Sequence, residues 1–170
     1  MDRRAGLPTG TTSAYYRTRE ALLHAIAARI TELDLADLTA MSDKACADAG
    51  AGPGITELAR IVMMAAREPW FTRTKARFEL ALQASRDPVL TKTLQQTSSL
   101  FATLAGQAVT GWQGPGAPPG AAMIEGQIVA VLTFVDGVMM GFVRGVNAFD
   151  DHHELARVLG ELVEGVARPA

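Results

Sequence analysis

A set of mostly apolar residues between positions 90 and 112 repeats with the period of an α-helix. Successive members are three or four residues apart: Leu90, Leu94, Thr97, Phe101, Leu104, Ala108 and Trp112. This spacing places them on one face of a helix. Alanine occurs 29 times and aromatic residues make up only 6% of the chain, whereas β-sandwiches are enriched in β-branched and aromatic residues. The sequence therefore predicts an all-α helical bundle.

Proline, glycine and the same periodicity divide the rest of the chain. Pro8 and the threonine-rich residues after it predict a short helix or turn, and Thr18 predicts the N-cap of a helix that continues past Met41. Further helices are expected over residues 55–68, 70–86, 89–112, 121–145 and 151–167. Glycine- and proline-rich stretches predict loops at 49–54 and 114–120.

Length and composition restrict the class of protein. A chain of 170 residues with 48% hydrophobic and 20% charged residues is expected to form one domain with a sizeable core and not a disordered chain. The single cysteine, Cys46, excludes a disulfide framework. The longest uncharged run in the most apolar region, residues 126–135, is shorter than the roughly 20 residues of a membrane helix. We therefore expect a soluble, cytoplasmic protein that does not enter a membrane.

The segment 121–145 is apolar on two sides. Ile124, Ile128, Val131, Val135, Val138 and Phe142 form one stripe, and Val129, Leu132, Met140 and Val143 form a second surface. A helix that is apolar on two faces needs cover on both, and a two-fold homodimer supplies it; a central helix buried inside a monomer is the alternative. The expected interface comprises residues of this helix and of the last one: Ile128, Val131, Val135, Leu155, Val158, Leu159, Leu162 and Val166.

Enzyme chemistry has little support in the sequence. The string from Asp150 to Glu154 contains two histidines between carboxylates, but adjacent histidines on a helix point about 100° apart, so Asp150 or Asp151 is better explained as a helix N-cap than as a metal ligand. His24 is expected to be partly buried structure. Asp136 within an apolar stretch predicts a structural hydrogen bond or, alternatively, a ligand or interface contact. We expect no catalytic residue, cofactor or metal.

The N-terminal end is basic and carries a recognisable pattern. Residues 1–30 contain five arginines against Asp2 and Glu20, a net charge of +3. Such a segment is either ordinary surface charge or a polyanion contact. The pairs Ala5-Gly6, Gly10-Thr11 and Tyr15-Tyr16, followed by Thr18-Arg19-Glu20-Ala21-Leu22, resemble the recognition helix and following helix of the tetracycline-repressor (TetR) family of bacterial regulators. The segment Val131–Val138 also resembles the Leu-Asp-Gly segment of that family's dimer helix.

The resemblance implies a ligand-responsive transcriptional repressor. Residues 1–30 would be a partial helix-turn-helix segment that includes the start of the connecting helix, and residues 31–170 a ligand-binding and dimerisation domain. The residues that the resemblance places toward operator DNA are Thr9, Gly10, Thr11, Ser13, Ala14, Tyr15, Arg17 and Arg19. The family has two further helices before this point, so we expect residues 1–14 to be frayed and specific operator binding by this chain to fail. A dimeric helical ligand-binding or adaptor protein without DNA binding is the alternative.

The resemblance also places a small hydrophobic effector inside the bundle. Flexible methionines and aromatic residues suit an adaptable apolar pocket. The candidates on the helices over 55–145 are Met63, Trp70, Phe71, Phe78, Leu82, Phe101, Leu104, Trp112 and Met123. Each of them is equally explained as plain core.

Overall fold

The computed structural model describes residues 2–49, 54–112 and 120–166, and the regular structure in these residues is entirely helical. A 3-10 turn, η1 (Asp2–Ala5), precedes seven α-helices: α1 (Thr11–Tyr15), α2 (Arg19–Ala49), α3 (Ile55–Met64), α4 (Trp70–Ala84), α5 (Pro88–Gly111), α6 (Ala121–Val143) and α7 (His152–Val166). The all-α prediction is therefore confirmed. Most of the two predicted loops, together with the side chain of Cys46, lies outside the described residues.

Side-chain caps determine where several helices begin. The Thr18 hydroxyl accepts a hydrogen bond from the Ala21 amide at 3.0 Å, and Asp151 accepts from the amides of His153 and Glu154 at 2.8 and 3.0 Å. Asp87 caps α5 in the same way, with Pro88 at the first helical position. Each cap satisfies amides that have no partner within the helix. The predicted N-cap roles of Thr18 and Asp151 are confirmed.

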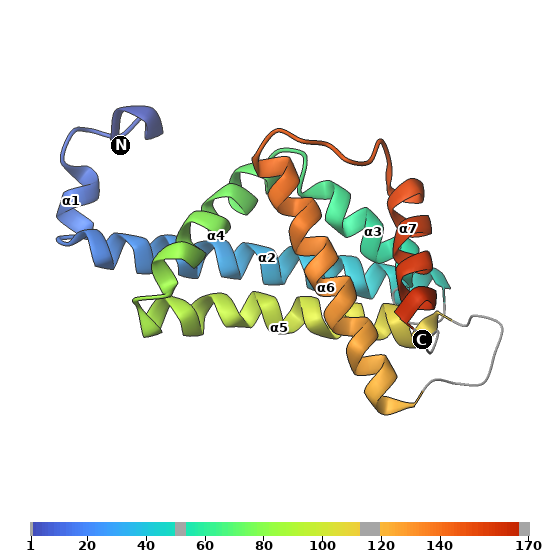
Figure 1. Ribbon diagram of the computed structural model, residues 1–170. Coiled ribbons are helices and arrows are strands. Elements are labelled where there is room, and N and C mark those ends of the chain that lie inside the picture. Colours follow the sequence, from blue (N-terminus) through green and yellow to red (C-terminus); the bar gives the residue numbers. More distant parts are fainter. Residues whose placement is uncertain (1, 50–53, 113–119, 167–170) are drawn as a thin grey trace.

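The long helices α2 and α5 run side by side (Figure 1). Helix α3 packs against α7, and α6 contacts both α5 and α7. The largest core cluster draws on α3, α5, α6 and α7; Val62, Ala105, Val131, Val135, Leu155 and Leu159 lie at its centre, each almost completely buried. A smaller cluster joins Ala27 and Ile30 of α2 to Leu80 and Leu90. Because of these contacts, helices α2 to α6 surround the same interior region of the bundle.

Helix α6 is long and apolar enough to cross a membrane by length and composition alone, and one of its faces contributes to the main core cluster. Val131 and Val135 face the protein core. The opposite face, which carries Val129 and Met140, is exposed, with Val129 59% accessible. The prediction of a helix that is apolar on two sides is confirmed, and one of its sides remains uncovered within a single chain.

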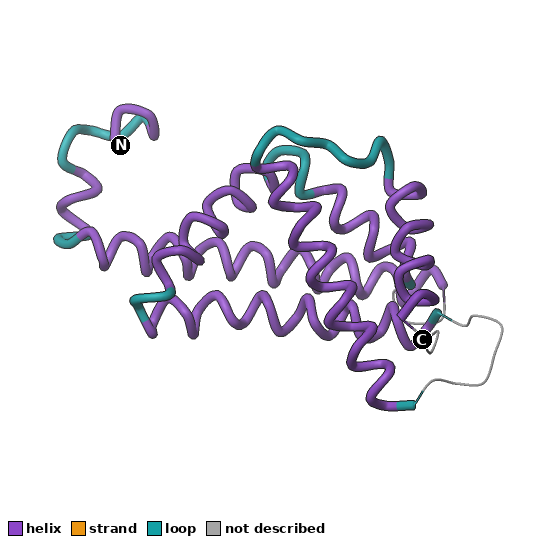
Figure 2. The backbone as a smooth tube through the Cα atoms, viewed as in Figure 1, coloured by secondary structure: helices purple, strands orange, loops and turns teal. Residues whose placement is uncertain are grey.

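The N-terminal segment extends beyond the bundle from the start of α2 (Figures 1 and 2). The Asp2 carboxylate accepts hydrogen bonds from the Gly10 amide at 2.7 Å and from the Thr12 amide at 3.2 Å, so an acidic side chain eight residues upstream caps α1. Gly10 has φ of 94°, a conformation that favours glycine. Asp2 therefore supplies a cap for α1 that the local sequence pattern did not reveal.

Candidate functional site

A narrow pocket lies among α2, α3, α4, α5 and α6; about 390 Å³ in and around it is free of protein atoms, and much of that space is open solvent. Most of its wall is apolar, and these residues are Leu38, Met41, Ile61, Met64, Ala65, Trp70, Phe101 and Met139. Asp34, Asp37, Thr74 and Arg77 supply the polar part of the wall. Its composition suits a small molecule with an apolar body and a polar group, because ligand sites are typically apolar with a few placed polar groups. The enclosed part of the pocket is narrow, so such a molecule would enter only with movement of the wall side chains.

The polar wall is an ionic network between α2 and α4. Asp34 is 4% exposed and accepts hydrogen bonds from the Nε and Nη2 atoms of Arg77 at 3.1 and 2.6 Å. Asp37 accepts from Nη2 of Arg73 at 2.5 Å and from Nε1 of Trp70 at 2.8 Å. The Arg73 guanidinium is the main reason that the pKa of Asp37 lies below its usual value, and the Trp70 N–H lowers it further. Two arginines therefore balance two carboxylates beside an apolar space.

Arg73 is the least satisfied member of this network. Its Nη1 atom lies 3.2 Å from Oδ1 of Asp34, but neither Nη1 nor Nε makes a hydrogen bond of good geometry with the residues that the structure describes. Its guanidinium also lies over the Trp70 ring, 5.8 Å from the centroid. A buried donor without an acceptor is costly, so the network holds Arg73 at a free-energy cost that α2 and α4 must offset through their packing.

Only two of the nine predicted pocket residues, Trp70 and Phe101, line the cavity. Met63, Phe71 and Phe78 are half-buried against the main core. Leu104 is buried beside Leu38 and Ile61, which are cavity-wall residues.

The remaining three candidates lie at the surface. Leu82 is 77% exposed because Leu80, two residues earlier and about 200° away around the helix, takes the buried position. Trp112, which follows the last residue of α5, is 39% exposed and packs over Gly160 of α7. Met123 is exposed in the first turn of α6. These three residues therefore do not line the cavity described above.

Helix α2 supplies four of the cavity residues that sequence reasoning missed, and α3, α4 and α6 supply the others. Asp34, Asp37, Leu38 and Met41 lie at spacings of three, one and three, so they share one face of this helix. Two of them are acidic and resemble ordinary surface residues in the sequence. A usable signal was present in the matching pair Arg73 and Arg77 on α4, four residues apart, which offers two cations to the two aspartates.

The residues expected to face DNA lie on α1 and around the start of α2. Thr9, Gly10, Ser13, Ala14, Tyr15, Arg17 and Arg19 are exposed and Thr11 is half-buried. The hydroxyl of Thr11 donates to the Pro8 carbonyl and that of Ser13 to the Gly10 carbonyl, at 2.7 and 3.1 Å. The structure thus brings these residues together on one protruding segment, and no other helix among the described residues packs extensively against α1.

The expected dimer residues separate into two groups. Val131, Val135, Leu155 and Leu159 are buried within one chain, so they have almost no surface to give to a partner, and the expected interface is corrected for them. Their stripes face the core because α7 packs against α3. Ile128, Val158 and Leu162 are half-buried and Val166 is exposed.

Asp136 lies on the exposed face of α6, and no hydrogen bond links it to the described residues. The expected structural hydrogen bond is therefore absent from that part of the chain. Partial burial raises the pKa of Asp136, and the charge of Arg77 offsets this only in part. His24, in contrast, is partly buried as expected and bonds to Asp87 at 2.6 Å.

Comparison with known families agrees with this architecture. The family model described as "Tetracyclin repressor-like, C-terminal domain" matches residues 49–168. The protein belongs to the TetR family of regulators, and α3 to α7 form its C-terminal domain. No curated protein and no solved structure shows significant similarity to the chain.

Proposed function

We propose that this protein is a ligand-responsive transcriptional repressor that acts in the cytoplasm as a homodimer. A small, largely hydrophobic effector binds in the cavity, and α1 together with the start of α2 contacts operator DNA. Residues 1–30 then form the DNA-binding segment and residues 31–170 the sensing and dimerisation domain. Membership of a regulatory family supports this function over an enzymatic one.

The continuity of α2 is the observation that carries the proposal. One helix runs from Arg19, next to α1, to the cavity residues Asp34, Asp37 and Met41. With a rise of about 1.5 Å per residue, Arg19 and Asp34 are about 22 Å apart along the helix. A ligand that displaces the cavity portion of α2 also displaces its N-terminal end. Effector and DNA binding are then linked through the two positions of one rigid element.

The exposed face of α6 is our proposed dimer surface. It combines small and apolar side chains at helical spacing with one acidic side chain, that of Asp136; the small and apolar members are Ala122, Gly126, Val129, Thr133, Gly137 and Met140, all exposed. Val166 of α7 adjoins it, since a Cβ on Gly126 would lie 3.9 Å from that side chain. Small residues allow two helices to approach closely, and a second copy of the chain would cover an apolar face that a single chain leaves open.

DNA binding is tested by fluorescence anisotropy with a labelled duplex pool at several salt concentrations. Helix α1 has no extensive helical support among the described residues, so we expect weak, sequence-independent and strongly salt-dependent binding by these 170 residues. Arg17→Ala and Arg19→Ala should each weaken binding and reduce the salt slope by about 1. Arg157 is an exposed arginine on α7. The variant Arg157→Ala is the matched control and should change neither the DNA affinity nor the salt slope.

Two results would contradict parts of this proposal. Nanomolar, sequence-specific binding would refute the expectation that α1 needs a supporting helix. Ligand binding in the cavity without any DNA affinity at low salt would instead favour a dimeric ligand-binding or adaptor protein.

A further inference from the structure

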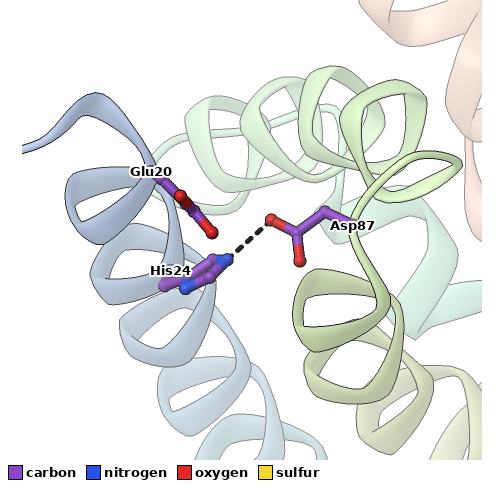
Figure 3. Close-up of side chains that lie close together, drawn as sticks. All are labelled: Glu20, His24 and Asp87. Atoms are coloured by element: carbon purple, nitrogen blue, oxygen red, sulfur yellow. Dashed lines mark hydrogen bonds and ion pairs between the residues drawn. The ribbon is translucent and has the colours of Figure 1, made fainter.

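Three metal-ligating side chains converge near the N-terminal end of α2. Glu20 and His24 are four residues apart and share one face of the helix, while Asp87 faces them from the turn between α4 and α5 (Figure 3). One ligand atom from each residue lies within 4.8 Å of the other two. The closest pair is Nε2 of His24 and Oδ2 of Asp87, at 2.6 Å.

The Asp87 carboxylate is held in a fixed direction. Its Oδ1 atom accepts hydrogen bonds from the amides of Val89 and Leu90, at 3.0 and 3.1 Å, as the cap of α5. Its Oδ2 atom is left for His24. This carboxylate is therefore oriented before any cation arrives.

A second carboxylate, that of Glu20, lies near His24. Glu20 points toward the same space as Asp87 (Figure 3), and it is exposed and forms no ion pair within the described part of the chain. Two carboxylates thus approach one imidazole, an arrangement that a cation between them would stabilise. His24 and Asp87 are only partly exposed, so the space is accessible to an ion from solvent but confined by α2 and the turn.

We propose that Glu20, His24 and Asp87 bind a divalent transition metal of the Zn²⁺ class. An imidazole nitrogen with two carboxylate oxygens suits Zn²⁺ better than Mg²⁺ or Ca²⁺, which prefer oxygen ligands alone. Zinc–ligand distances of about 2.0–2.2 Å separate neighbouring ligand atoms by roughly 3.3 Å in a tetrahedron. Side-chain movements on the order of 1 Å bring the three atoms to that spacing, and water takes the fourth position.

The site would clamp the beginning of α2 to the turn that precedes α5. His24 lies five residues after Arg19, where α2 begins and α1 is attached. On the proposed function, the metal would restrict the helix end that presents the DNA-facing residues. Metal binding itself does not depend on that function, and its test uses no DNA.

The test is isothermal titration of the untagged chain with Zn²⁺ in a non-chelating buffer. All samples for the titration of the variants carry His152→Gln and His153→Gln, so that these two adjacent imidazoles, whose ring centroids are 4.0 Å apart, cannot contribute to the Zn²⁺ signal. We expect one Zn²⁺ per chain with micromolar or tighter affinity. Glu20→Gln, His24→Gln and Asp87→Asn should each weaken binding about tenfold or more. Asp87→Asn retains a residue that caps helices well, so its fold is preserved.

Two further measurements make the result decisive. Circular dichroism should give the same helix content for all variants, and Co²⁺ in place of Zn²⁺ should produce visible absorption bands that disappear in His24→Gln. The proposal is overturned if affinity is no tighter than millimolar, or if the three substitutions leave both the isotherm and the Co²⁺ bands unchanged. Zn²⁺ binding by the wild-type chain that is absent from the chain with only His152→Gln and His153→Gln would also overturn it.

Discussion

Trp70 donates its indole N–H to the Asp37 carboxylate across 2.8 Å, and this bond joins the first residue of α4 to the middle of α2 at the cavity wall. The same carboxylate accepts a hydrogen bond from Arg73 at 2.5 Å. Asp37 is therefore the point at which the apolar and ionic parts of the cavity wall meet.

Asp37→Asn should lower stability at neutral pH. The pKa of Asp37 in the folded protein is depressed below its ordinary value of 3.8. Its stabilising contribution is therefore present above pH 3.8 and is lost as the pH falls through the lower, folded-state pKa. Urea unfolding at several pH values checks this: the difference between wild type and variant should shrink below pH 3.8. A difference that grows on acidification would contradict the assignment.

Asp34→Asn should be strongly destabilising. Asp34 is buried between Arg73 and Arg77, and removal of one partner from a buried ionic network leaves charge without compensation, at a cost of about 3–5 kcal/mol. Asp43→Asn, an exposed position on the same helix, should change the free energy of unfolding by less than about 0.5 kcal/mol. Equal effects in urea unfolding would show that the network does not stabilise the pairing of α2 with α4.

Asp136→Asn should have the opposite effect. Partial burial raises the pKa of Asp136 above 3.8, so the folded state disfavours the ionised form, and this cost appears as the pH rises through the folded-state pKa. The variant should therefore melt at a higher temperature than wild type at neutral pH and show no advantage at pH 3. Glu125→Gln, exposed on the same helix, is the control, and an equal gain there would refute burial as the cause.

Val129→Asp should convert the proposed dimer to a monomer. Val129 lies at the centre of the exposed α6 face, where a second copy would bury an unpaired charge. Leu82→Asp introduces the same charge at an exposed apolar residue on α4 and should leave the dimer intact. Sedimentation velocity at micromolar concentration distinguishes monomer from dimer for each variant. A wild-type monomer, or equal dissociation in both variants, contradicts the proposed surface.

Much of the helical architecture follows from local sequence signals. Thr18, Asp87-Pro88 and Asp151 mark helix starts through capping chemistry that operates within a few residues, and apolar periodicity marks the faces between them. Helix α3, however, ends at Met64 and not at residue 68.

The cavity and the interface depended on tertiary contacts that periodicity does not encode. The pairing of Asp34 with Arg77 joins residues 43 positions apart on different helices, so neither sequence segment reveals that it faces the cavity. The apolar stripe on α7 was evident in the sequence. The sequence pattern of such a stripe is the same whether the residues that pack against it belong to the same chain or to a partner. Leu155 and Leu159 are covered by their own chain.

The central claim is that an occupied cavity moves the N-terminal end of α2 in a homodimer. Double electron–electron resonance tests it with one spin label per chain at Arg17→Cys in a Cys46→Ser background, since dipolar coupling then arises only between two subunits. Anilinonaphthalene sulfonate, whose aromatic rings match the apolar wall and whose sulfonate matches Arg77, serves as the probe ligand, and Ala65→Leu at the cavity wall is the control that narrows the site. We predict a defined distance between labels that shifts when the probe binds wild type and stays fixed in Ala65→Leu. Absence of dipolar coupling, or an unchanged distance at saturating probe, would contradict the account.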